Sequence, residues 1–316
     1  MNKSSKIFIA GHKGTVGSAV LRSLQQKGYC NLITASSSEL DLRVQQDVNA
    51  FFLKEQPLFV IDAAARVGGI LANNTYPYQF ISENLMIQTN IIDASLKNGV
   101  EKFIFLGSSC VYPKFAPLPL KEESLLSSSL EPTNEWYAVA KIAGVKTCEA
   151  IKKQFNKNFF SMMPTNVYGP NDNFDLMTSH VLPAMIRKFH DAKQNNCQAV
   201  ELWGTGTPMR EFIFVDDLAD AIVFGFENNL HEDIYNVGTG IDVTIKDLAL
   251  LIQKIVGFKG EIAWDTSKPD GTPRKLMDIS RISNAGWNAK YSLEEGIQIT
   301  YNWFKQNIET YKQVKL

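Results

Sequence analysis

The stretch Lys6-Ile-Phe-Ile-Ala-Gly11-His-Lys-Gly14-Thr-Val-Gly17 decides the fold of this chain, because it joins a short apolar run to the start of an amphipathic helix over 18–27. The apolar run indicates a buried strand. The glycines permit a tight turn and let backbone amides approach a pyrophosphate at the positive end of the helix. The GxxGxxG spacing is a variant of GxGxxG and is weak alone, but the strand and helix around it supply the required context. The stretch therefore predicts a dinucleotide-binding unit.

The same alternation of short apolar runs and helical stretches continues along the first half of the chain. Further strands are expected at 32–35, 59–63, 102–106 and near 159–163, and helices at 82–98 and 135–155. Buried strands that alternate with helices form parallel sheets with right-handed crossovers. The sequence therefore predicts an α/β fold with a Rossmann-type, doubly wound parallel sheet.

At 316 residues the chain is longer than a single hydrophobic core usually supports. Beyond Gly169 the alternation loosens, with helices expected at 181–191, 244–256 and 292–306, a strand at 210–215 and a loop at 268–275. Asp216 and Asp217 are expected to cap a helix over 218–228. We expect two domains: residues 1–170 with about 211–240, and a smaller, mainly C-terminal α/β domain of about 171–210 and 241–316.

Composition excludes several classes of function. The net charge of −1 lacks the basic bias of nucleic-acid-binding proteins, and no apolar stretch is long enough for a membrane span. Residues 1–6 run directly into the first strand pattern, without a signal-peptide pattern. The four cysteines are widely spaced and the four histidines show no metal-ligand spacing. These features indicate a reduced, cytoplasmic setting and no metal site.

The segment after the second expected strand, Thr34-Ala-Ser-Ser-Ser-Glu39, bears on which dinucleotide binds. NAD sites place an acidic residue at the tip of this strand to bind the ribose hydroxyls, and no acid stands at this tip. Lys13 lies in the glycine loop, where its charge can meet a 2′-phosphate. Both features favour NADP over NAD, although the arginine that an NADP site usually carries is missing.

Tyr137-Ala-Val-Ala-Lys141 places a tyrosine and a lysine on one face of the helix expected at 135–155. A tyrosine is a poor acid–base group at neutral pH, and a lysine cation beside it favours the phenolate and lowers the tyrosine pKa. Ser108 or Ser109, at the carboxyl end of the strand over 102–106, can hydrogen-bond a reacting carbonyl, because ligands of open α/β sheets gather at that edge. The pattern indicates an oxidoreductase that moves a proton to or from a hydroxyl carbon.

Cys110 and His180 are two further candidates for chemistry. Cys110 follows the two serines, and His180 lies in Thr178-Ser-His-Val-Leu-Pro183. A cysteine is usually buried packing, and a lone histidine is more often structural. Beside a reductase site, however, the two can act as a base and an acid. A ketone acidifies its α-carbons, so such a pair can invert a stereocentre through an enolate.

The glycine loop, the strand-end serine and the YxxxK helix together resemble the extended branch of the short-chain dehydrogenase/reductase superfamily, which works on nucleotide sugars. Seven segments narrow the resemblance to the GDP-L-fucose synthase family: GSSCVYPK, EPTNEWYAVAK, MPTNVYGPNDNF, SHVLPA, WGTGTPMREF, NVGTG and KPDGTPRK. The resemblance covers about residues 6–304. It implies a bifunctional enzyme that epimerises GDP-4-keto-6-deoxy-D-mannose at C3 and C5 and then reduces C4 with NADPH, giving GDP-L-fucose.

The same resemblance implies a role for individual residues. Cys110 would be the base and His180 the acid of epimerisation, and Tyr137 would give the proton during reduction, assisted by Lys141 and Ser108. The first domain would bind NADP and the second the nucleotide sugar, in a homodimer paired through the opposite face of the YxxxK helix. The implied GDP-sugar contacts are Lys188, Trp203, Arg210 and Asp270. The implied NADP contacts are Gly11, His12, Lys13, Gly14, Thr15, Val16, Gly17, Ser37, Asp41, Leu42, Leu106, Gly107, Ser108, Ser109, Lys141, Pro164, Thr165, Asn166, Val167 and His180.

The chain departs from the family at the cofactor end, because Lys13 and Ser37 stand where some members carry arginine. Two alternatives remain. A redox-neutral nucleotide-sugar 4-epimerase or 4,6-dehydratase is one, although a dehydratase would be expected to carry an Asp-Glu pair in place of Ser109-Cys110. The other is a non-catalytic, redox-sensing module that binds NADPH and a partner protein. Such a module has no need of Tyr137, Lys141, Ser108, Cys110 and His180 together.

Overall fold

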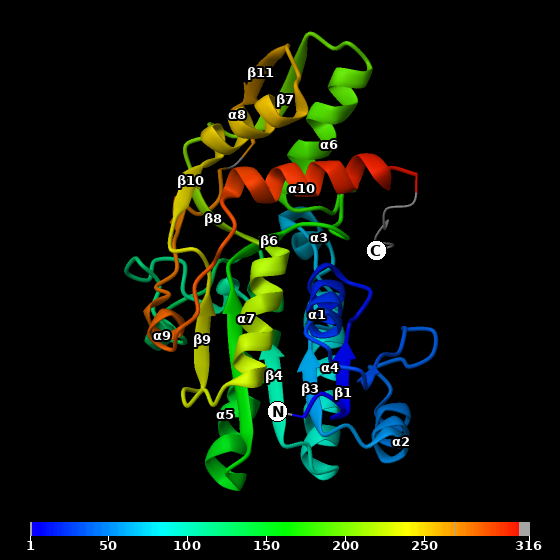
Figure 1. Cartoon of the computed structure of the whole chain (residues 1–316). Helices are drawn as coiled ribbons and strands as arrows, with labels where there is room; N and C mark the ends of the chain where they lie inside the picture. Colours follow the sequence, from blue (N-terminus) through cyan, green and yellow to red (C-terminus); the bar gives the residue numbers. More distant parts are fainter. Residues whose placement is uncertain (1, 269, 310–316) are drawn as a thin grey trace.

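A computed structural model describes residues 2–268 and 270–309, and its centre is a parallel sheet (Figure 1). The first strands pair as expected, since Ile7 lies opposite Leu32 on one side and opposite Phe59 on the other. The strands run in the order β2 (Leu32–Ile33), β1 (Ile7–Ala10), β3 (Phe59–Asp62), β4 (Lys102–Leu106), β5 (Asn158–Pro164), β9 (Ile234–Val237). The order of strand addition reverses between β1 and β3, and open α/β sheets bind ligands at the carboxyl ends of the strands beside such a point.

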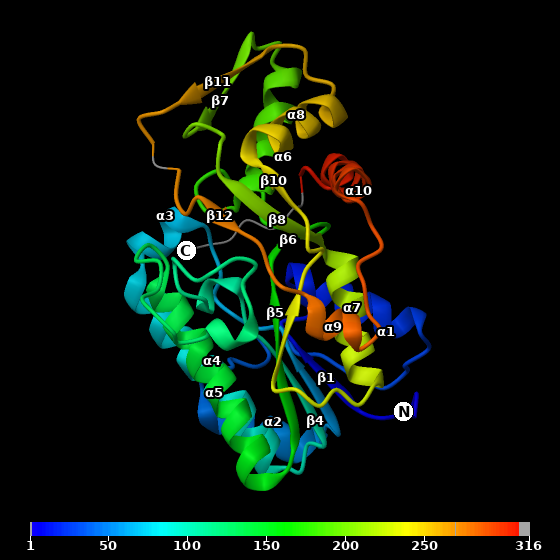
Figure 2. The same ribbon diagram turned by 90° about the vertical axis from the view of Figure 1, so that its left-hand side faces the viewer.

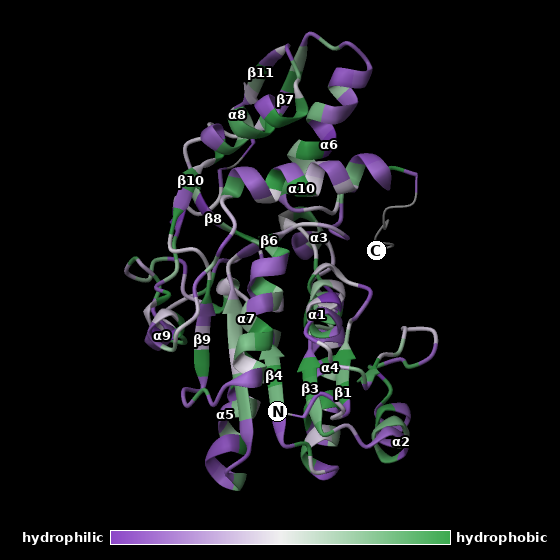
Figure 3. Cartoon of the chain, viewed as in Figure 1, coloured by the Kyte–Doolittle hydropathy of each residue, from purple (hydrophilic) through white to green (hydrophobic). Residues whose placement is uncertain are grey.

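Helices cover both faces of this sheet (Figure 2), and the central strands are made largely of hydrophobic residues (Figure 3). Their side chains are divided between two cores, one on each face. Ile7 and Ile9 of β1 face the core of α1 (Thr15–Gln26) and α7 (Val215–Glu227). Phe8 faces the other core, with α2 (Gln45–Glu55), α4 (Pro77–Lys97) and α5 (Glu135–Phe155). This arrangement confirms the predicted doubly wound α/β fold.

A second group of elements lies beyond the carboxyl edge of the main sheet (Figure 1). Its central strand, β8, pairs with β10, β12 and β6, and a separate pair joins β7 to β11. The strands are β6 (Asn166–Tyr168), β7 (Ala199–Trp203), β8 (Met209–Phe214), β10 (Asp242–Thr244), β11 (Glu261–Asp265) and β12 (Arg274–Lys275). The helices are α6 (Val181–Gln194), α8 (Ile245–Val256), α9 (Ser280–Asn284) and α10 (Leu293–Gln306), with short α3 (Ile70–Thr75) before α4 and 3-10 turns at Ser109–Val111 and Glu122–Ser124.

Most predicted elements are present, and several have the predicted bounds. Strand β4 and helix α5 begin and end where the sequence placed them. Helices α2, α3 and α9 and strands β6, β7, β9, β10 and β11 were not predicted, and β12 lies in the segment predicted as a loop. Pro269 in that segment, Met1 and residues 310–316 of the expected domains lie outside the described residues. No described helix is long and apolar enough to cross a membrane.

The predicted capping role of Asp216 and Asp217 is wrong. Helix α7 begins at Val215, so both acids lie in its first turn. Asp217 is buried and accepts hydrogen bonds from the backbone N–H groups of Lys290 and Tyr291, each at 3.0 Å. Asp216 is paired with Arg22 of α1 at 2.8 Å. The two acids therefore connect α7 to neighbouring segments and do not cap its N-terminus.

Candidate active site

The glycine loop between β1 and α1 has no room for larger side chains. Gly11 has a φ of +76°, and a Cβ built on it would lie 2.6 Å from the carbonyl oxygen of Ala63. A Cβ on Gly17 would lie 2.2 Å from the carbonyl oxygen of Gly11. Because glycine alone tolerates both the positive φ and this close approach, the backbone of the loop is free to form a cradle.

The polar atoms of this cradle suit a dinucleotide phosphate. Gly14 is the N-cap residue of α1, so no side chain occupies the positive end of the helix. The Nδ1 atom of His12 is buried without a hydrogen-bond partner in the described part of the chain. Lys13 is exposed at the tip, and Thr15 and Val16 lie in the first turn of α1. The loop therefore fits the pyrophosphate of NADP.

The loop after β2 holds the other residues expected at the adenosine end. Ser37 is exposed and carries no charge, and Leu42 is half-buried. Asp41 is paired with Arg43 at 2.8 Å, and the guanidinium of Arg43 also lies 3.7 Å from Glu83. The sequence prediction missed Arg43, which brings a cation to this loop but is already neutralised by two acids.

The segment from Pro164 to Val167 connects the main sheet to the small one. Pro164 ends β5, while Asn166 and Val167 lie in β6, which pairs with β8. The side chains of Thr165 and Asn166 both donate hydrogen bonds to the carbonyl oxygen of Glu211, at 3.1 and 2.7 Å. This anchorage fixes the segment at the carboxyl edge of the sheet, beside the expected cofactor position.

Helix α5 positions Tyr137 and Lys141 by packing closely on β4. A Cβ built on Gly144 would lie 2.4 Å from the ring of Phe105, so the glycine lets the helix approach the sheet. The Nζ atom of Lys141 donates a hydrogen bond to the carbonyl oxygen of Leu106 at 2.8 Å and lies 5.9 Å from the centre of the Tyr137 ring. The predicted pair therefore meets the end of β4, where Gly107 and Ser108 follow.

Burial favours the neutral forms of this pair. It raises the pKa of Tyr137, and the nearby Cys110 raises it further. Burial also lowers the pKa of Lys141, while the charges of Asp62 and Cys110 oppose that effect. A tyrosine that holds its proton is in the form required of a proton donor.

Cys110 lies in the 3-10 turn that follows β4, where Ser108 is the N-cap residue. The backbone N–H of Cys110 donates to the Oγ atom of Ser108 at 3.4 Å, and both Ser109 and Cys110 are buried. Burial raises the pKa of the thiol, whereas its hydrogen bond with Ser108 and the charges of Lys275 and Lys141 oppose this. The structure therefore brings Ser108, Cys110, Tyr137 and Lys141 together.

His180 belongs to another element, since it is the N-cap residue of α6. The residues before it pack against the loop after β3: Gly69 N–H donates to the carbonyl oxygen of Thr178 at 2.9 Å. A Cβ on the adjacent Gly68 would lie 3.2 Å from Phe80, whose ring packs edge-on against Tyr137 with 6.3 Å between ring centres. The residue as a whole is exposed, and desolvation by the surrounding protein atoms lowers the pKa of its imidazole.

The four residues expected at the GDP-sugar form two pairs in the second group of elements. The Nζ atom of Lys188 lies 5.9 Å from the ring centre of Trp203, which is exposed on β7. Arg210 is largely buried, which lowers its pKa, and the charge of Asp270 opposes that effect. Asp270 itself accepts hydrogen bonds from the backbone and side chain of Thr205, at 2.7 and 2.8 Å. One pair offers a flat aromatic surface with a cation, and the other a buried guanidinium.

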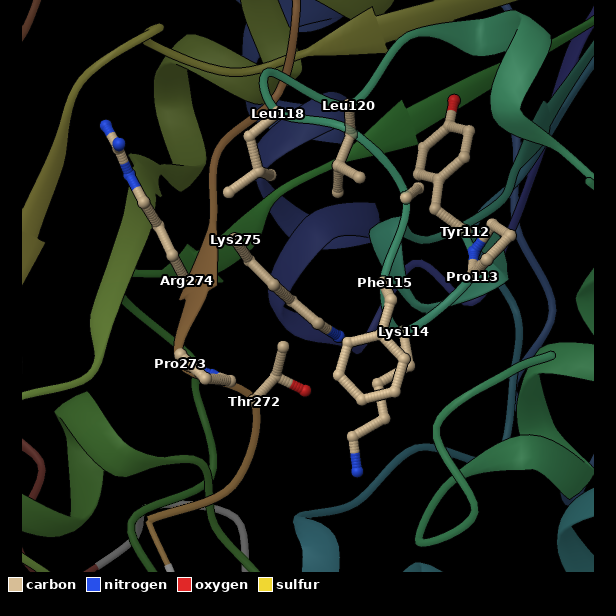
Figure 4. A pocket seen from close by; sticks show the side chains of 11 residues that line it. Tyr112, Pro113, Lys114, Phe115, Leu118, Leu120, Thr272, Pro273, Arg274 and Lys275 are labelled. Carbon is tan, nitrogen blue, oxygen red and sulfur yellow. The ribbon is translucent and has the colours of Figure 1, made fainter. Parts of the chain in front are cut away.

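A pocket of about 260 Å³ lies between the segment after Cys110 and strand β12 (Figure 4). Lys275 points into this pocket, toward Phe115, whereas Arg274 points away from it (Figure 4). Lys275 lies opposite Arg210 in the parallel pair of β12 and β8. Burial and the charge of Arg210 both lower the pKa of Lys275. Two neighbouring cations favour an anionic ligand. This role of Lys275 was not predicted from the sequence, although the residue lies in one of the motifs described above.

A bound metal ion can replace a side-chain acid or base in catalysis, so the positions of possible metal ligands matter. In the described ranges, 2–268 and 270–309, no group of three or more His, Cys, Asp or Glu side chains could hold a metal ion. The four cysteines, Cys30, Cys110, Cys148 and Cys197, are free thiols.

Comparison with known proteins shows the family to which this chain is similar. Residues 7–238 match the model of the NAD dependent epimerase/dehydratase family. GDP-L-fucose synthase 1 of Arabidopsis thaliana is 56% identical over 307 residues, which cover 97% of this chain and 95% of that protein.

Solved structures are similar over almost the whole chain. A GDP-6-OMe-4-keto-L-xylo-heptose reductase from C. jejuni has a TM-score of 0.92 and 41% identity, with 97% of this chain and 99% of that one covered. A GDP-L-fucose synthetase from Naegleria fowleri bound to NADP has a TM-score of 0.90 and 27% identity, with 99% and 98% covered.

Proposed function

The chain belongs to the NAD dependent epimerase/dehydratase family, within its GDP-L-fucose synthase group, and on that premise we propose how its residues divide the work. The protein is an NADP-dependent epimerase and reductase that forms GDP-L-fucose from GDP-4-keto-6-deoxy-D-mannose. The main observation behind this assignment of roles is the cluster at the end of β4, where a thiol, a serine and the tyrosine–lysine pair lie together. The redox-neutral alternative has no comparable use for Cys110.

Epimerisation falls to Cys110 and His180. The C4 ketone acidifies the hydrogens at C3 and C5, so a thiolate at Cys110 can remove one of them and leave the electron pair in an enolate. His180, on the neighbouring α6, then gives a proton to the opposite face of that carbon. The positive charges of Lys275 and Lys141 support the thiolate. One proton leaves and one returns, so the reaction involves no oxidation.

Reduction uses the same carbonyl. When bound in the glycine loop, NADPH supplies the hydride that C4 receives. Ser108 donates a hydrogen bond to the carbonyl oxygen, and Tyr137 gives that oxygen a proton as negative charge develops on it. Lys141 stabilises the phenolate that remains. A single polarised carbonyl therefore serves both half-reactions.

Cofactor contacts are proposed for the residues around the carboxyl edge of the main sheet. The cradle from Gly11 to Gly17 would hold the pyrophosphate, while Lys13 would meet the 2′-phosphate near Ser37. Arg43 lies at the same end, where Asp41 and Glu83 balance its charge. Leu106 to Ser109 and Pro164 to Val167 would line the nicotinamide end, with Lys141 and His180.

The GDP-sugar is proposed to lie along β7, β8 and β12. Trp203 offers an apolar surface and Lys188 a cation beside it, while Arg210 and Lys275 suit the pyrophosphate. We propose that this group of elements, about 171–210 and 241–316 with β8 added, is the nucleotide-sugar part of the chain. The main sheet, residues 1–170 with α7 and β9, is then the cofactor part.

Arg210→Met is expected to raise the KM for the GDP-sugar by about 10- to 100-fold, because a charge-assisted hydrogen bond contributes about 1.5–3 kcal/mol. The KM for NADPH should stay within about two-fold, since the change is outside the cofactor part. Initial rates at varied GDP-sugar and NADPH concentrations measure both constants. Arg274→Met is the matched control, because Arg274 is exposed, pairs with Asp242 and points away from the pocket (Figure 4). Equal effects of the two changes would contradict the proposed position of the pyrophosphate.

The whole function is tested by mixing purified protein with NADPH and GDP-4-keto-6-deoxy-D-mannose, following NADPH absorbance and identifying the sugar by NMR. Oxidation of NADPH with GDP-L-fucose as product is the expected result. An unepimerised GDP-6-deoxyhexose would retain the reductase and refute the epimerase. Absence of oxidation would refute both, and would favour a redox-neutral sugar enzyme or a binding module.

A cytoplasmic homodimer is the proposed working form. Four free thiols suit a reducing compartment. The outer surface of α4 and α5 exposes the apolar side chains of Met86, Trp136 and Val139, each about 40% exposed. Such neighbouring apolar side chains on two packed helices are suited to a subunit contact.

Trp136→Asp is expected to convert the proposed dimer to a monomer, because a buried interface does not tolerate an unpaired charge. Sedimentation velocity measures the change, with Leu250→Asp on α8 as a control of similar exposure. A monomeric wild-type protein, or a dimer that survives Trp136→Asp but not Leu250→Asp, would contradict the proposed contact surface.

A further inference from the structure

A carboxyl group lies in the interior of the main sheet, behind the active site. Asp62, the last residue of β3, has no solvent exposure. Its Oδ1 atom accepts a hydrogen bond from the backbone N–H of Ala64 at 3.1 Å. Its Oδ2 atom has no hydrogen-bond partner among the described residues. An unsatisfied buried carboxyl is costly, so its presence calls for a physical explanation.

The register of the sheet shows which way Asp62 points. Asp62 lies opposite Ala10 of β1 and Phe105 of β4, and Phe105 lies opposite Ser161 of β5. Residues opposite one another in paired strands share a face of the sheet. Ala10 and Phe105 belong to the core under α4 and α5. The carboxyl group therefore points toward the helices that cover this face.

Lys141 reaches the same place from α5. Its Nζ atom lies 4.6 Å from the centre of the Phe105 ring, and Phe105 is the direct neighbour of Asp62 across the strands. Lys141 is only 3% exposed. In the described part of the chain the two groups form no direct ion pair, but attraction between charges reaches further in a dry interior than in water. The anion and the cation are thus both buried beside the same aromatic ring.

We propose that Asp62 is the buried counter-charge of Lys141 and a positioning residue for the reduction, which keeps the lysine protonated and its ammonium group beside Tyr137. This inference rests on the proposed function. It assigns Asp62 no contact with the substrate. The carboxylate acts through Lys141, because the ammonium group is what stabilises the phenolate after Tyr137 has given its proton.

The other ionisable groups around Asp62 leave this partnership in place. From α5, Lys141 and the buried thiol of Cys148 face it, and burial and the Asp62 charge both raise the pKa of that thiol. The charged groups of α4 are paired elsewhere, Glu83 with Arg66 and Asp93 with Lys97. On α2, Lys54 is paired with Glu55, and on β1 no residue is ionisable. Among the described residues, Lys141 is therefore the cation that acts on Asp62.

The pH dependence of the reduction follows from these two groups. Burial raises the pKa of Asp62 to about 6, and Lys141 opposes the rise. Above about pH 6 the carboxylate is charged and supports the lysine cation; below it the support is absent. Removal of the carboxylate should let Lys141 lose its proton at a lower pH. The alkaline limb of the kcat profile should then move to lower pH.

The test compares Asp62→Asn with wild type from pH 5 to 9.5, measuring kcat and KM for NADPH oxidation with the 4-keto GDP-sugar. The ratio of wild-type to variant kcat is expected to be near one below pH 6 and to rise to about ten at alkaline pH, as a limb displaced by about one pKa unit requires. KM should change little. Ser161→Ala, which removes an uncharged group from the same row, should leave the profile unchanged. A ratio independent of pH would overturn the inference.

Two measurements without turnover separate this inference from the proposed function. The ¹³Cε resonance of Lys141, assigned through Lys141→Arg, should titrate at lower pH in Asp62→Asn than in wild type. Thermal unfolding gives the second measurement, because the folded protein holds the Asp62 proton more tightly than the unfolded chain. The contribution of the protonated Asp62 to wild-type stability is therefore lost as pH rises from about 4 to about 6. Over this range the Tm of the variant should rise relative to the Tm of the wild type. If the Lys141 resonance shifts as expected without NADPH oxidation, the proposed function fails alone; if Lys141 titrates at the same pH in both proteins, the pairing with Lys141 is refuted whatever the Tm values show.

Discussion

Tyr137→Phe is expected to lower NADPH oxidation with the 4-keto GDP-sugar by about 10³-fold, within the range of about 10²- to 10⁴-fold that general acid catalysis contributes. Phenylalanine keeps the ring that packs against Phe80 but has no proton to give. Binding of NADPH should be unchanged, because the hydroxyl alone is removed. Stopped-flow measurement of a single turnover isolates the hydride step.

The same variant should still exchange the hydrogens at C3 and C5. Exchange depends on Cys110 and His180, so NMR in D₂O should show deuterium entering both positions at close to the wild-type rate. Tyr291→Phe provides the control, because that tyrosine is exposed and lies far along the chain, before α10. Retention of more than about a tenth of the wild-type hydride rate in Tyr137→Phe would assign the proton to another donor.

Cys110→Ser should have the opposite pattern and lose C3 and C5 exchange by about 10²-fold or more, because a serine hydroxyl is a far weaker acid than a thiol and rarely provides a base. NADPH oxidation should continue at a measurable rate and give an unepimerised GDP-6-deoxyhexose. Product analysis by NMR distinguishes this sugar from GDP-L-fucose.

The pH dependence of exchange gives a second check on Cys110. Burial raises the pKa of its thiol, and the base is the thiolate, so exchange by the wild-type protein should increase with pH through the neutral range. Cys197→Ser, which removes an exposed thiol, should leave exchange unchanged. Wild-type rates of exchange in Cys110→Ser would show that another group is the base.

The sequence predicted those parts of the site that depend on local pattern. The apolar run of β4 and the helical spacing of α5 are visible along the chain, so Ser108, Tyr137 and Lys141 could be assigned to one edge before the fold was known. The glycine loop was predictable for the same reason, since strand, turn and helix follow one another directly.

The remaining parts depend on contacts between distant segments. Lys275 joins the site because the two residues of β12 pair with β8. A strand of two residues is too short to show an alternation of apolar and polar side chains, so β12 was not predictable. Asp62 ends an apolar run, as the last residue of a strand does. Its relation to Lys141, 79 positions further along the chain, arises from the register of β3 and β4. Arg43 reaches Glu83 only after α2 folds back on α4, so its place near the cofactor was not predictable.

The cation pair of Arg210 and Lys275 has a consequence for protein engineering. Both residues come from strands outside the main sheet, whereas Tyr137, Lys141 and Ser108 come from elements within or on it. A chimera that exchanges β7, β8 and β12 with those of a relative should thus acquire specificity for a different nucleotide or sugar while keeping its own redox chemistry. One boundary for such a graft lies at Pro164, where the chain first passes from the main sheet to the small one, and further boundaries lie where it returns to the main sheet through α7 and β9.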